Sequence, residues 1–152
     1  MTMETSHGLL WFSSLDDLYN VFGDYLPGKS FLDLGSGDGK VVEFASEYTN
    51  RARGVEIEED LWKKSAVKLQ ISFGNLFNIS ICDEEILYYF LKGSKHELEL
   101  IKKLNDEFHG IVIIYYRRMK EKQVDVFSSF LDAKEIKVYP YVKVYSFINR
   151  KQ

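Results

Sequence analysis

The residues best suited to ligand chemistry lie between positions 31 and 40, where the sequence reads FLDLGSGDGK. An apolar run with one acid, Asp33, predicts a short buried strand, and the glycines after it predict a sharp turn into another element. Glycine tolerates positive φ and lets a ligand approach the backbone, so Gly35, Gly37 and Gly39 are typical of a loop around a bound molecule. An ordinary glycine turn has the same pattern, so the surrounding residues must decide between the two interpretations.

A second carboxylate, Glu56, ends the next predicted strand. Ligands of open α/β sheets bind beyond the carboxyl ends of the strands, so we expect the glycine turn, Glu56 and Asn75 to line one crevice. Glu56 follows Gly39 by 17 residues, and a carboxylate at this point is placed to accept hydrogen bonds from both hydroxyls of a ribose. A surface glutamate at a strand end is the alternative interpretation.

The charges near the turn favour a cationic nucleoside over a dinucleotide. The dinucleotide fingerprint G-x-G-x-x-G requires glycine at its sixth position, where this chain has Lys40. Asp33 and Asp38 would repel a pyrophosphate, whereas they would attract a cofactor that carries amino and sulfonium groups. The sequence therefore predicts an anionic crevice that binds a positively charged nucleoside.

These motifs resemble those of the seven-strand methyltransferases that use S-adenosylmethionine, and the resemblance covers nearly the whole chain. Residues 33–39 (DLGSGDG) resemble the first motif of that superfamily, and residues 54–58 (GVEIE) resemble the second. The resemblance implies that the glycine turn holds the methionine part and the sulfonium side, that Glu56 holds the ribose, and that Asn75 lies near the adenine. The cofactor-binding residues it implies are Asp33, Gly35, Ser36, Gly37, Asp38, Gly39, Glu56, Ile57, Asn75, Leu76 and Phe90.

Within the superfamily, the chain most resembles small single-domain protein-lysine methyltransferases of the archaeal and mitochondrial type. Their G-N-x-F stretch is similar to residues 74–77, and it also precedes an apolar strand that ends in phenylalanine. Ser13 and Ser14 resemble the N-terminal cap of those enzymes near the cofactor carboxylate. The chain departs from the superfamily at Asn75, which replaces an acid, and after Phe90, where no N-P-P-Y or D-P-P-Y tetrapeptide follows. The second departure disfavours methylation of exposed base amino groups.

The resemblance implies methyl transfer from S-adenosylmethionine to an unidentified acceptor, a protein or a small molecule, with a lysine amine as the class to test first. Direct in-line displacement requires alignment and desolvation but no dedicated base. Four tyrosines fall near the ends of two predicted strands, where they either orient an amine or pack within the sheet, and packing is the more frequent role. They are Tyr88, Tyr89, Tyr115 and Tyr116. A non-catalytic domain of the same fold, which binds the cofactor or a partner, is the alternative function.

Apolar spacing predicts the elements that must position these residues. Helices are expected at residues 15–26, 39–48, 58–66, 94–108 and 122–131, and strands at 31–34, 52–57, 67–73, 85–91, 110–116, 136–139 and 142–148. Ser13 or Ser14 can cap the first helix, and Ser94 with Glu97 has the spacing of a capping box. The pattern predicts an α/β fold with a doubly wound, mostly parallel sheet and an antiparallel C-terminal hairpin. We expect one domain over residues 1–152, with a cap helix within residues 1–28.

The remaining features of the sequence concern the compartment of the protein, its cysteine and metal binding. No basic N-terminal region or long apolar run is present, which predicts a cytoplasmic protein without a membrane span. Cys82 is the only cysteine, so no internal disulfide is expected, and a small buried apolar residue is its most frequent role. No spacing of Cys and His residues predicts a metal site.

Charge is distributed unevenly along the chain. The net charge is −3, yet residues 101–152 hold 11 Lys and Arg against 6 Asp and Glu. Such a segment can meet an acidic partner or a nucleic acid, but its cations are scattered through predicted strands and helices, so we expect a solvated surface. A nucleic-acid interface would instead show affinity that depends steeply on salt concentration. The sequence leaves the oligomeric state open.

Overall fold

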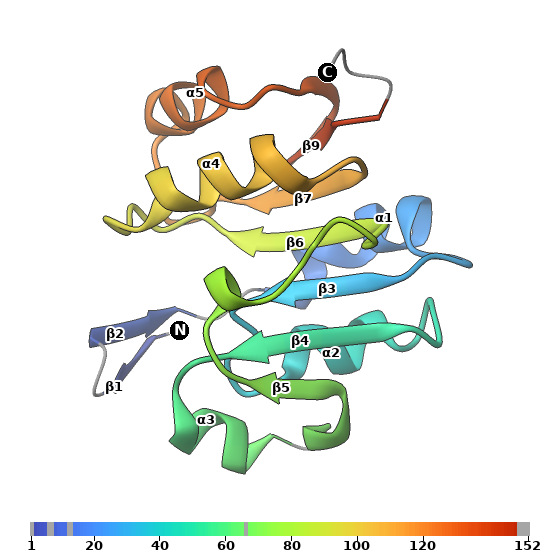
Figure 1. Cartoon of the computed structure of the whole chain (residues 1–152), viewed down its shortest axis with the longest axis vertical. Helices are drawn as coiled ribbons and strands as arrows, with labels where there is room; N and C mark the ends of the chain where they lie inside the picture. Colours follow the sequence, from blue (N-terminus) through green and yellow to red (C-terminus); the bar gives the residue numbers. More distant parts are fainter. Residues whose placement is uncertain (1, 6–7, 12–13, 66, 149–152) are drawn as a thin grey trace.

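The computed structural model describes residues 2–5, 8–11, 14–65 and 67–148. A seven-stranded sheet with the strand order β5-β4-β3-β6-β7-β9-β8 forms its centre (Figure 1). These strands are β3 (Phe31–Leu34), β4 (Ala52–Glu56), β5 (Ile71–Phe73), β6 (Ile86–Phe90), β7 (Ile111–Tyr115), β8 (Lys134–Tyr139) and β9 (Val142–Ser146). Strands β3 to β7 are mutually parallel, and β9 runs antiparallel to both β7 and β8. The predicted α/β class and the C-terminal hairpin are confirmed.

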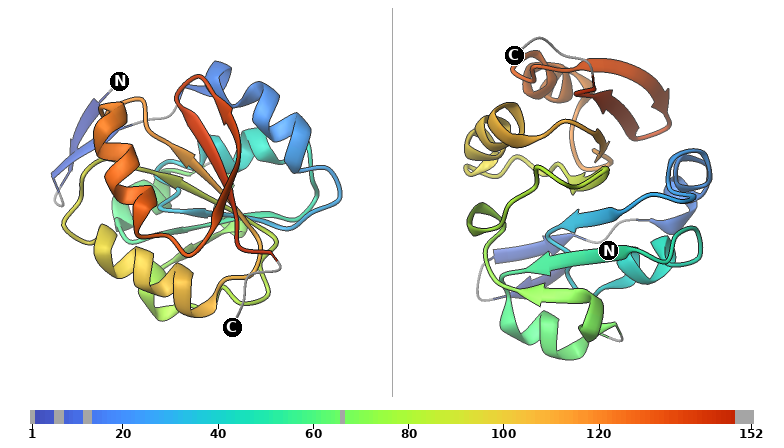
Figure 2. Two further views of the ribbon diagram at one scale, coloured as in Figure 1. Left: turned by 90° about the horizontal axis from the view of Figure 1, so that it is seen from above. Right: turned by 45° about the vertical axis from the view of Figure 1, so that its right-hand side comes forward.

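Helices cover both faces of the sheet (Figures 1 and 2). They are α1 (Leu15–Tyr25), α2 (Lys40–Ala45), α3 (Glu59–Lys64), α4 (Glu97–Glu107) and α5 (Glu121–Ser129). The apolar faces of α1 and α2 pack on one side of the sheet, and those of α4 and α5 pack on the other, which gives two separate cores. On β3, Phe31 belongs to the α1 side, whereas Leu32 and Leu34 belong to the α4 side. The strands therefore consist of continuous apolar residues because both of their faces are buried.

Several boundaries differ from the prediction. The expected strand at residues 67–73 forms a strand only from Ile71, because residues 68–70 make the short 3₁₀ helix η1 (Lys68–Gln70). The side chain of Gln70 donates to the carbonyl of Ala52 at 2.9 Å and so takes the place of a backbone partner at the start of β4. The expected helix at residues 39–48 ends at Ala45. An antiparallel pair, β1 (Thr2–Thr5) and β2 (Gly8–Trp11), was not predicted.

Of the two predicted helix caps, the position at Ser14 is confirmed, whereas the capping box at Ser94 and Glu97 was wrong. Ser14 is the N-cap of α1, but its side chain makes no capping hydrogen bond, and its backbone N–H donates to the Tyr115 hydroxyl at 3.2 Å. Ser13 lies outside the described residues. His96, not Ser94, is the N-cap of α4. The buried Glu97 carboxylate, expected in a capping box, instead accepts from the Tyr89 hydroxyl at 2.7 Å. A buried phenol needs an acceptor, and this requirement draws Glu97 away from the helix end.

Two further findings bear on the predicted environment. Cys82 is exposed in a turn before β6, so the expectation of a buried apolar cysteine was wrong. Its Sγ lies 3.1 Å from the Ser80 hydroxyl. In the part of the chain that the structure describes, every helix is too short or too polar to cross a bilayer.

Candidate functional site

The predicted cofactor residues gather at the carboxyl ends of the parallel strands. The chain proceeds from β3 to β4 and β5 on one side and then crosses to β6 on the other side of β3, so the switch point lies between β3 and β6. The glycine turn follows β3, Glu56 ends β4, Asn75 follows β5, and Phe90 ends β6. The arrowheads of these four strands point to the same edge of the sheet (Figure 1). This is the edge where open α/β sheets bind their ligands.

The glycines of the turn have two different roles. Gly35, Gly37 and Gly39 have φ values of +110°, +59° and +84°, which side chains rarely adopt. At Gly35 and Gly37, no described atom lies within 4 Å of the point where a Cβ would stand, so the backbone there has an open face. At Gly39 a Cβ would collide with the Ser65 hydroxyl and lie 2.8 Å from Ile71 Cδ1. Gly39 therefore allows close packing, whereas Gly35 and Gly37 leave space for a ligand.

Backbone N–H groups of the turn donate mainly within the protein. The N–H of Gly37 donates to Glu56 Oε1 at 2.6 Å, and the N–H of Ser36 donates to the Val55 carbonyl at 2.9 Å. The N–H groups of Gly35, Gly39 and Lys40 donate to Val55, Ser36 and Asp38, respectively. A phosphate-binding turn directs free N–H groups at its anion. The N–H groups of Gly35, Ser36, Gly37 and Gly39 are therefore occupied within the protein.

The Glu56 carboxylate is held in place by two backbone donors. Its Oε1 accepts from Gly37, its Oε2 accepts from the N–H of Glu58 at 2.7 Å, and the residue is 6% exposed. Burial raises the pKa of Glu56, while the two hydrogen bonds and the charge of Lys92 oppose this rise. A carboxylate has about four lone-pair sites, so acceptor capacity remains for ligand hydroxyls.

Asp33 is deeply buried, although the sequence analysis predicted that its charge attracts a cationic cofactor. The residue is 2% exposed, and burial together with the charge of Glu56 raises its pKa well above the usual range. Burial therefore disfavours the negative charge that the sequence analysis assigned to Asp33. Asp38 is less buried, and its carboxylate lies 3.8 Å from the ammonium of Lys40.

The other predicted site residues contribute surface rather than charge. Ile57 is 50% exposed directly after Glu56 and offers an apolar surface at the edge. Asn75 caps a second 3₁₀ helix, η2 (Leu76–Asn78), because its Oδ1 accepts from the N–H of Phe77 at 3.0 Å. Leu76 packs against the core under α4, and Phe90 packs edge to face on Tyr115 with 4.9 Å between ring centroids.

Ser36 and the four strand-end tyrosines face the interior. Ser36 is 4% exposed, its hydroxyl has no hydrogen-bond partner in the described part of the chain, and its Cβ lies against Gly54. All four tyrosines are less than 9% exposed, so the expectation that they pack within the sheet is confirmed: Tyr88, Tyr89, Tyr115 and Tyr116. An amine acceptor therefore gains little from their ring faces.

The sequence analysis missed Lys92 and the Glu97 carboxylate that holds its backbone. Lys92 is exposed just beyond the end of β6, and its charge opposes the rise that burial causes in the pKa of Asp33 and Glu56. The N–H of Lys92 donates to Glu97 at 3.2 Å, so the carboxylate that binds Tyr89 also fixes the backbone here. Lys92 stands where the superfamily tetrapeptide is absent, and that position was the signal available in the sequence.

No protein-family model matches this chain, and no curated protein matches it significantly. Solved structures do match. The RNA methyltransferase from Salinibacter ruber, in complex with S-adenosyl-L-homocysteine, is 20% identical with a TM-score of 0.61, covering 94% of this chain and 97% of that one. A methyltransferase from Pyrococcus furiosus is 15% identical with a TM-score of 0.67, covering 90% and 84%.

A third match is the tRNA (uracil-54, C5)-methyltransferase from Pyrococcus abyssi in complex with S-adenosyl-L-homocysteine. It is 15% identical with a TM-score of 0.61, and the match covers 85% of this chain and 36% of that one. None of these three is a named protein-lysine methyltransferase, so they give the narrower resemblance no support. At such low identity the likeness shows the fold: this chain has the Rossmann-like α/β fold of those methyltransferases.

Proposed function

We propose that this protein binds S-adenosylmethionine and transfers its methyl group to an acceptor. The observation that carries the proposal is the pairing of an open glycine turn with a buried, immobilised carboxylate at the switch point of the sheet. Gly35 and Gly37 leave the backbone face open, and Glu56 retains acceptor capacity beside them. The Rossmann-like fold shared with known methyltransferases supports the same conclusion.

Each part of the site has a role that follows from its chemistry. Glu56 accepts hydrogen bonds from the ribose hydroxyls, and the open face at Gly35 and Gly37 admits the methionine part. The exposed Ile57 provides an apolar surface for the adenine. S-adenosylmethionine supplies a methyl group made electrophilic by the positive sulfur to which it is bonded. The protein then has to align the acceptor and exclude water, and no base is required.

Two classes of acceptor remain to be separated. A lysine amine is implied by the G-N-x-F stretch at residues 74–77, but the tyrosines expected to orient it are buried in the sheet. RNA is the second candidate acceptor, because the Salinibacter ruber protein of the same fold is an RNA methyltransferase. A non-catalytic domain that only binds the cofactor is the alternative from a different class.

Two measurements test the proposal. Calorimetric titration should show binding of S-adenosylhomocysteine and no comparable binding of NAD, because the N–H groups of the turn are occupied within the protein and the Glu56 carboxylate lies beside them. Transfer of radiolabelled methyl groups to fractionated cellular protein, RNA and small molecules then identifies the acceptor. Binding without transfer to any fraction would favour the non-catalytic domain. Absence of S-adenosylhomocysteine binding would contradict both.

A further inference from the structure

Lys92 lies at the candidate site without an assigned partner. It is exposed just beyond β6, which adjoins β3 across the switch point of the sheet (Figure 1). Lys40, a cation next to the glycine turn, is paired with Asp38, whereas Lys92 forms no ion pair with the residues that the structure describes. The ammonium of Lys92 is therefore available to a ligand.

The alternation of side chains along β6 assigns Lys92 to one face of the sheet. Tyr88 belongs to the core under α1, and Phe90 packs against that core, whereas Leu91 belongs to the core under α4. The N–H of Leu91 donates to the Tyr115 carbonyl at 2.8 Å, so the chain stays extended beside β7 up to this residue. Successive side chains of an extended chain point to opposite faces, which directs Lys92 to the α1 side.

The buried carboxyl groups of Asp33 and Glu56 lie on the same face as Lys92. Each adjoins a residue of the core under α4, because Leu34 follows Asp33 and Val55 precedes Glu56. The electrostatics agree with this placement, since the charge of Lys92 opposes the rise that burial causes in the pKa of both groups. Lys92 therefore faces the ends of β3 and β4, where the glycine turn begins.

The backbone of Lys92 is fixed from the other side of the sheet. Its N–H donates to Glu97 Oε2 at 3.2 Å, and the same oxygen accepts from the Tyr89 hydroxyl at 2.7 Å. Gly93 follows with a φ of +78°, so the chain turns directly after the lysine. A lysine ammonium on a fixed backbone acts as a positioned point charge, which suits a single anionic group of a ligand.

The strand order indicates which group of the cofactor reaches Lys92. Strand β3 lies between β4 and β6. A cofactor with its ribose at Glu56 and its methionine part over the glycine turn directs the end of that part toward β6. This end carries a carboxylate, which is the only anionic group of S-adenosylmethionine. We propose that the ammonium of Lys92 binds this carboxylate. The proposal rests on the proposed function, because it assigns a residue to one group of the same cofactor.

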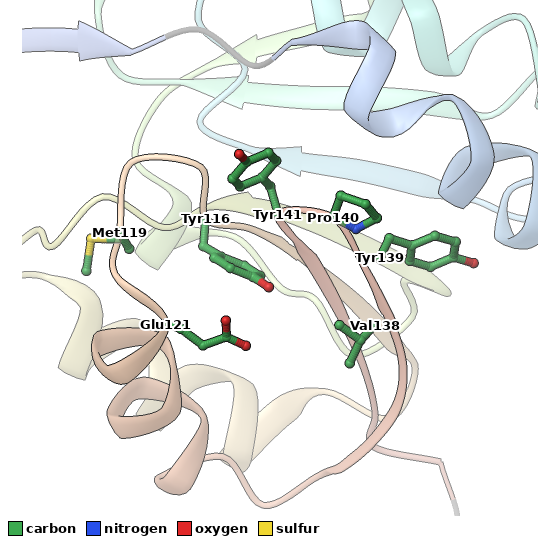
Figure 3. A pocket seen from close by; sticks show the side chains of 7 residues that line it. All are labelled: Tyr116, Met119, Glu121, Val138, Tyr139, Pro140 and Tyr141. Atoms are coloured by element: carbon green, nitrogen blue, oxygen red, sulfur yellow. The ribbon is translucent and has the colours of Figure 1, made fainter.

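A cavity of about 620 Å³ between α5 and the β8–β9 hairpin offers no comparable place for an anion (Figure 3). Its charged lining residue is Glu121. Lys143 is buried beside it and lies 3.6, 3.2 and 3.7 Å from the carboxylates of Glu121, Asp125 and Glu135, respectively. The positive charge there is already neutralised, whereas that of Lys92 is not.

The test is calorimetric titration with S-adenosylhomocysteine and with its decarboxylated analogue, which lacks only the carboxylate. We expect Lys92→Met to weaken S-adenosylhomocysteine binding about fivefold, the upper range for an ion pair of an exposed lysine. The same substitution should not weaken binding of the analogue, and Lys92→Arg should retain most of the affinity for S-adenosylhomocysteine. Lys95→Met is the matched control, because it removes the same charge from an exposed position between β6 and α4.

Every other outcome contradicts the assignment of the carboxylate to Lys92. A structural role of Lys92 predicts equal losses for S-adenosylhomocysteine and the analogue, and an effect of net charge predicts equal losses in Lys92→Met and Lys95→Met. An ammonium close to the sulfonium predicts that Lys92→Met binds S-adenosylmethionine more tightly and S-adenosylhomocysteine as before. Each of these results would overturn the proposal while leaving cofactor binding intact, as would unchanged affinity in Lys92→Met. Absence of S-adenosylhomocysteine binding by the natural chain would overturn the proposed function as well.

Discussion

Among single residues, Glu56 contributes most to the proposed cofactor site, because it joins the end of β4 to the glycine turn through Gly37. Glu56→Ala removes the ribose acceptor and leaves the N–H of Gly37 without its partner. We expect a loss of about 1 to 3 kcal/mol in the binding free energy of S-adenosylhomocysteine, measured by calorimetry. Glu59→Ala is the matched control, because Glu59 is exposed on α3. Unchanged affinity in Glu56→Ala would place the ribose elsewhere.

Asp33 permits a prediction about pH, because burial and the charge of Glu56 raise its pKa well above the usual value. A carboxyl group with a raised folded-state pKa binds more protons in the folded than in the unfolded protein. The free energy of unfolding therefore falls as pH rises from about 4 through the raised pKa. Asp33→Asn cannot titrate and so does not lose stability in this way. We therefore expect the Tm of the variant, minus the Tm of the natural chain, to increase as pH rises from about 4 to about 7.

Glu85 supplies a control of opposite sign for the Asp33 measurement. A hydrogen bond from the N–H of Ser30 lowers its pKa, as do the charges of Lys29 and Arg51. Stability from Glu85 is therefore present above about pH 4 and is lost as pH falls, so Glu85→Gln should differ from the natural chain mainly at neutral pH, with a lower Tm. A Tm difference for Asp33→Asn that stays constant with pH would contradict the inferred titration of Asp33.

At the scale of elements, Tyr115 fastens α1 to the carboxyl end of β7. Its hydroxyl donates to Asp17 at 2.7 Å and accepts from the N–H of Ser14, and burial together with the Asp17 hydrogen bond raises its pKa to about 12. Tyr115→Phe removes both hydrogen bonds while the ring remains packed on Phe90. We expect a loss of about 1 to 3 kcal/mol and a fall in Tm of about 2 to 10 °C, measured by thermal denaturation. Tyr19→Phe, at an exposed position on the same helix, should leave Tm within about 1 °C.

The same elements show what sequence patterns can predict. The buried strands were found because sheets covered on both faces require continuous apolar runs, as residues 31–34 and 111–115 show. The hydrogen bonds that replace the expected caps were not found, because their partners, Tyr115 for Ser14 and Tyr89 for Glu97, are distant in sequence or lie on a neighbouring strand. Periodicity carries no information about such partners.

The sequence also predicted the location of the candidate site, but not the packing of its residues. Motif spacing brought the glycine turn and Glu56 to one sheet edge, because each follows a parallel strand. It did not distinguish Gly39, which packs against Ser65 and Ile71, from Gly37, which leaves open space. Nor did it show that Asp33 is buried deeply enough to raise its pKa. Both properties depend on packing between segments that are distant in the chain.

For the molecule as a whole, charge is divided along the sheet edge. Residues 1–100 carry 9 Lys and Arg against 17 Asp and Glu, and residues 101–152 carry 11 against 6. The strand order places the acidic part around β3 and β4 and the basic part around β7, β9 and β8. A cationic cofactor matches the acidic part, and RNA, one of the two proposed acceptor classes, would match the basic part. If RNA is the acceptor, rising salt should weaken its binding far more than the binding of S-adenosylhomocysteine.

Binding of the cofactor product should also stabilise the whole fold, because Glu56 and the glycine turn connect β3, β4 and α2 only in the folded chain. S-adenosylhomocysteine at about 100 times its dissociation constant adds about 2.7 kcal/mol to the free energy of unfolding. For a chain of this size that corresponds to a rise in Tm of about 5 to 10 °C in a thermal denaturation scan. NAD should produce no such rise, and Glu56→Ala should need a higher ligand concentration for the same shift. A rise of equal size in both proteins at equal concentration would mean that the ligand binds away from the switch point.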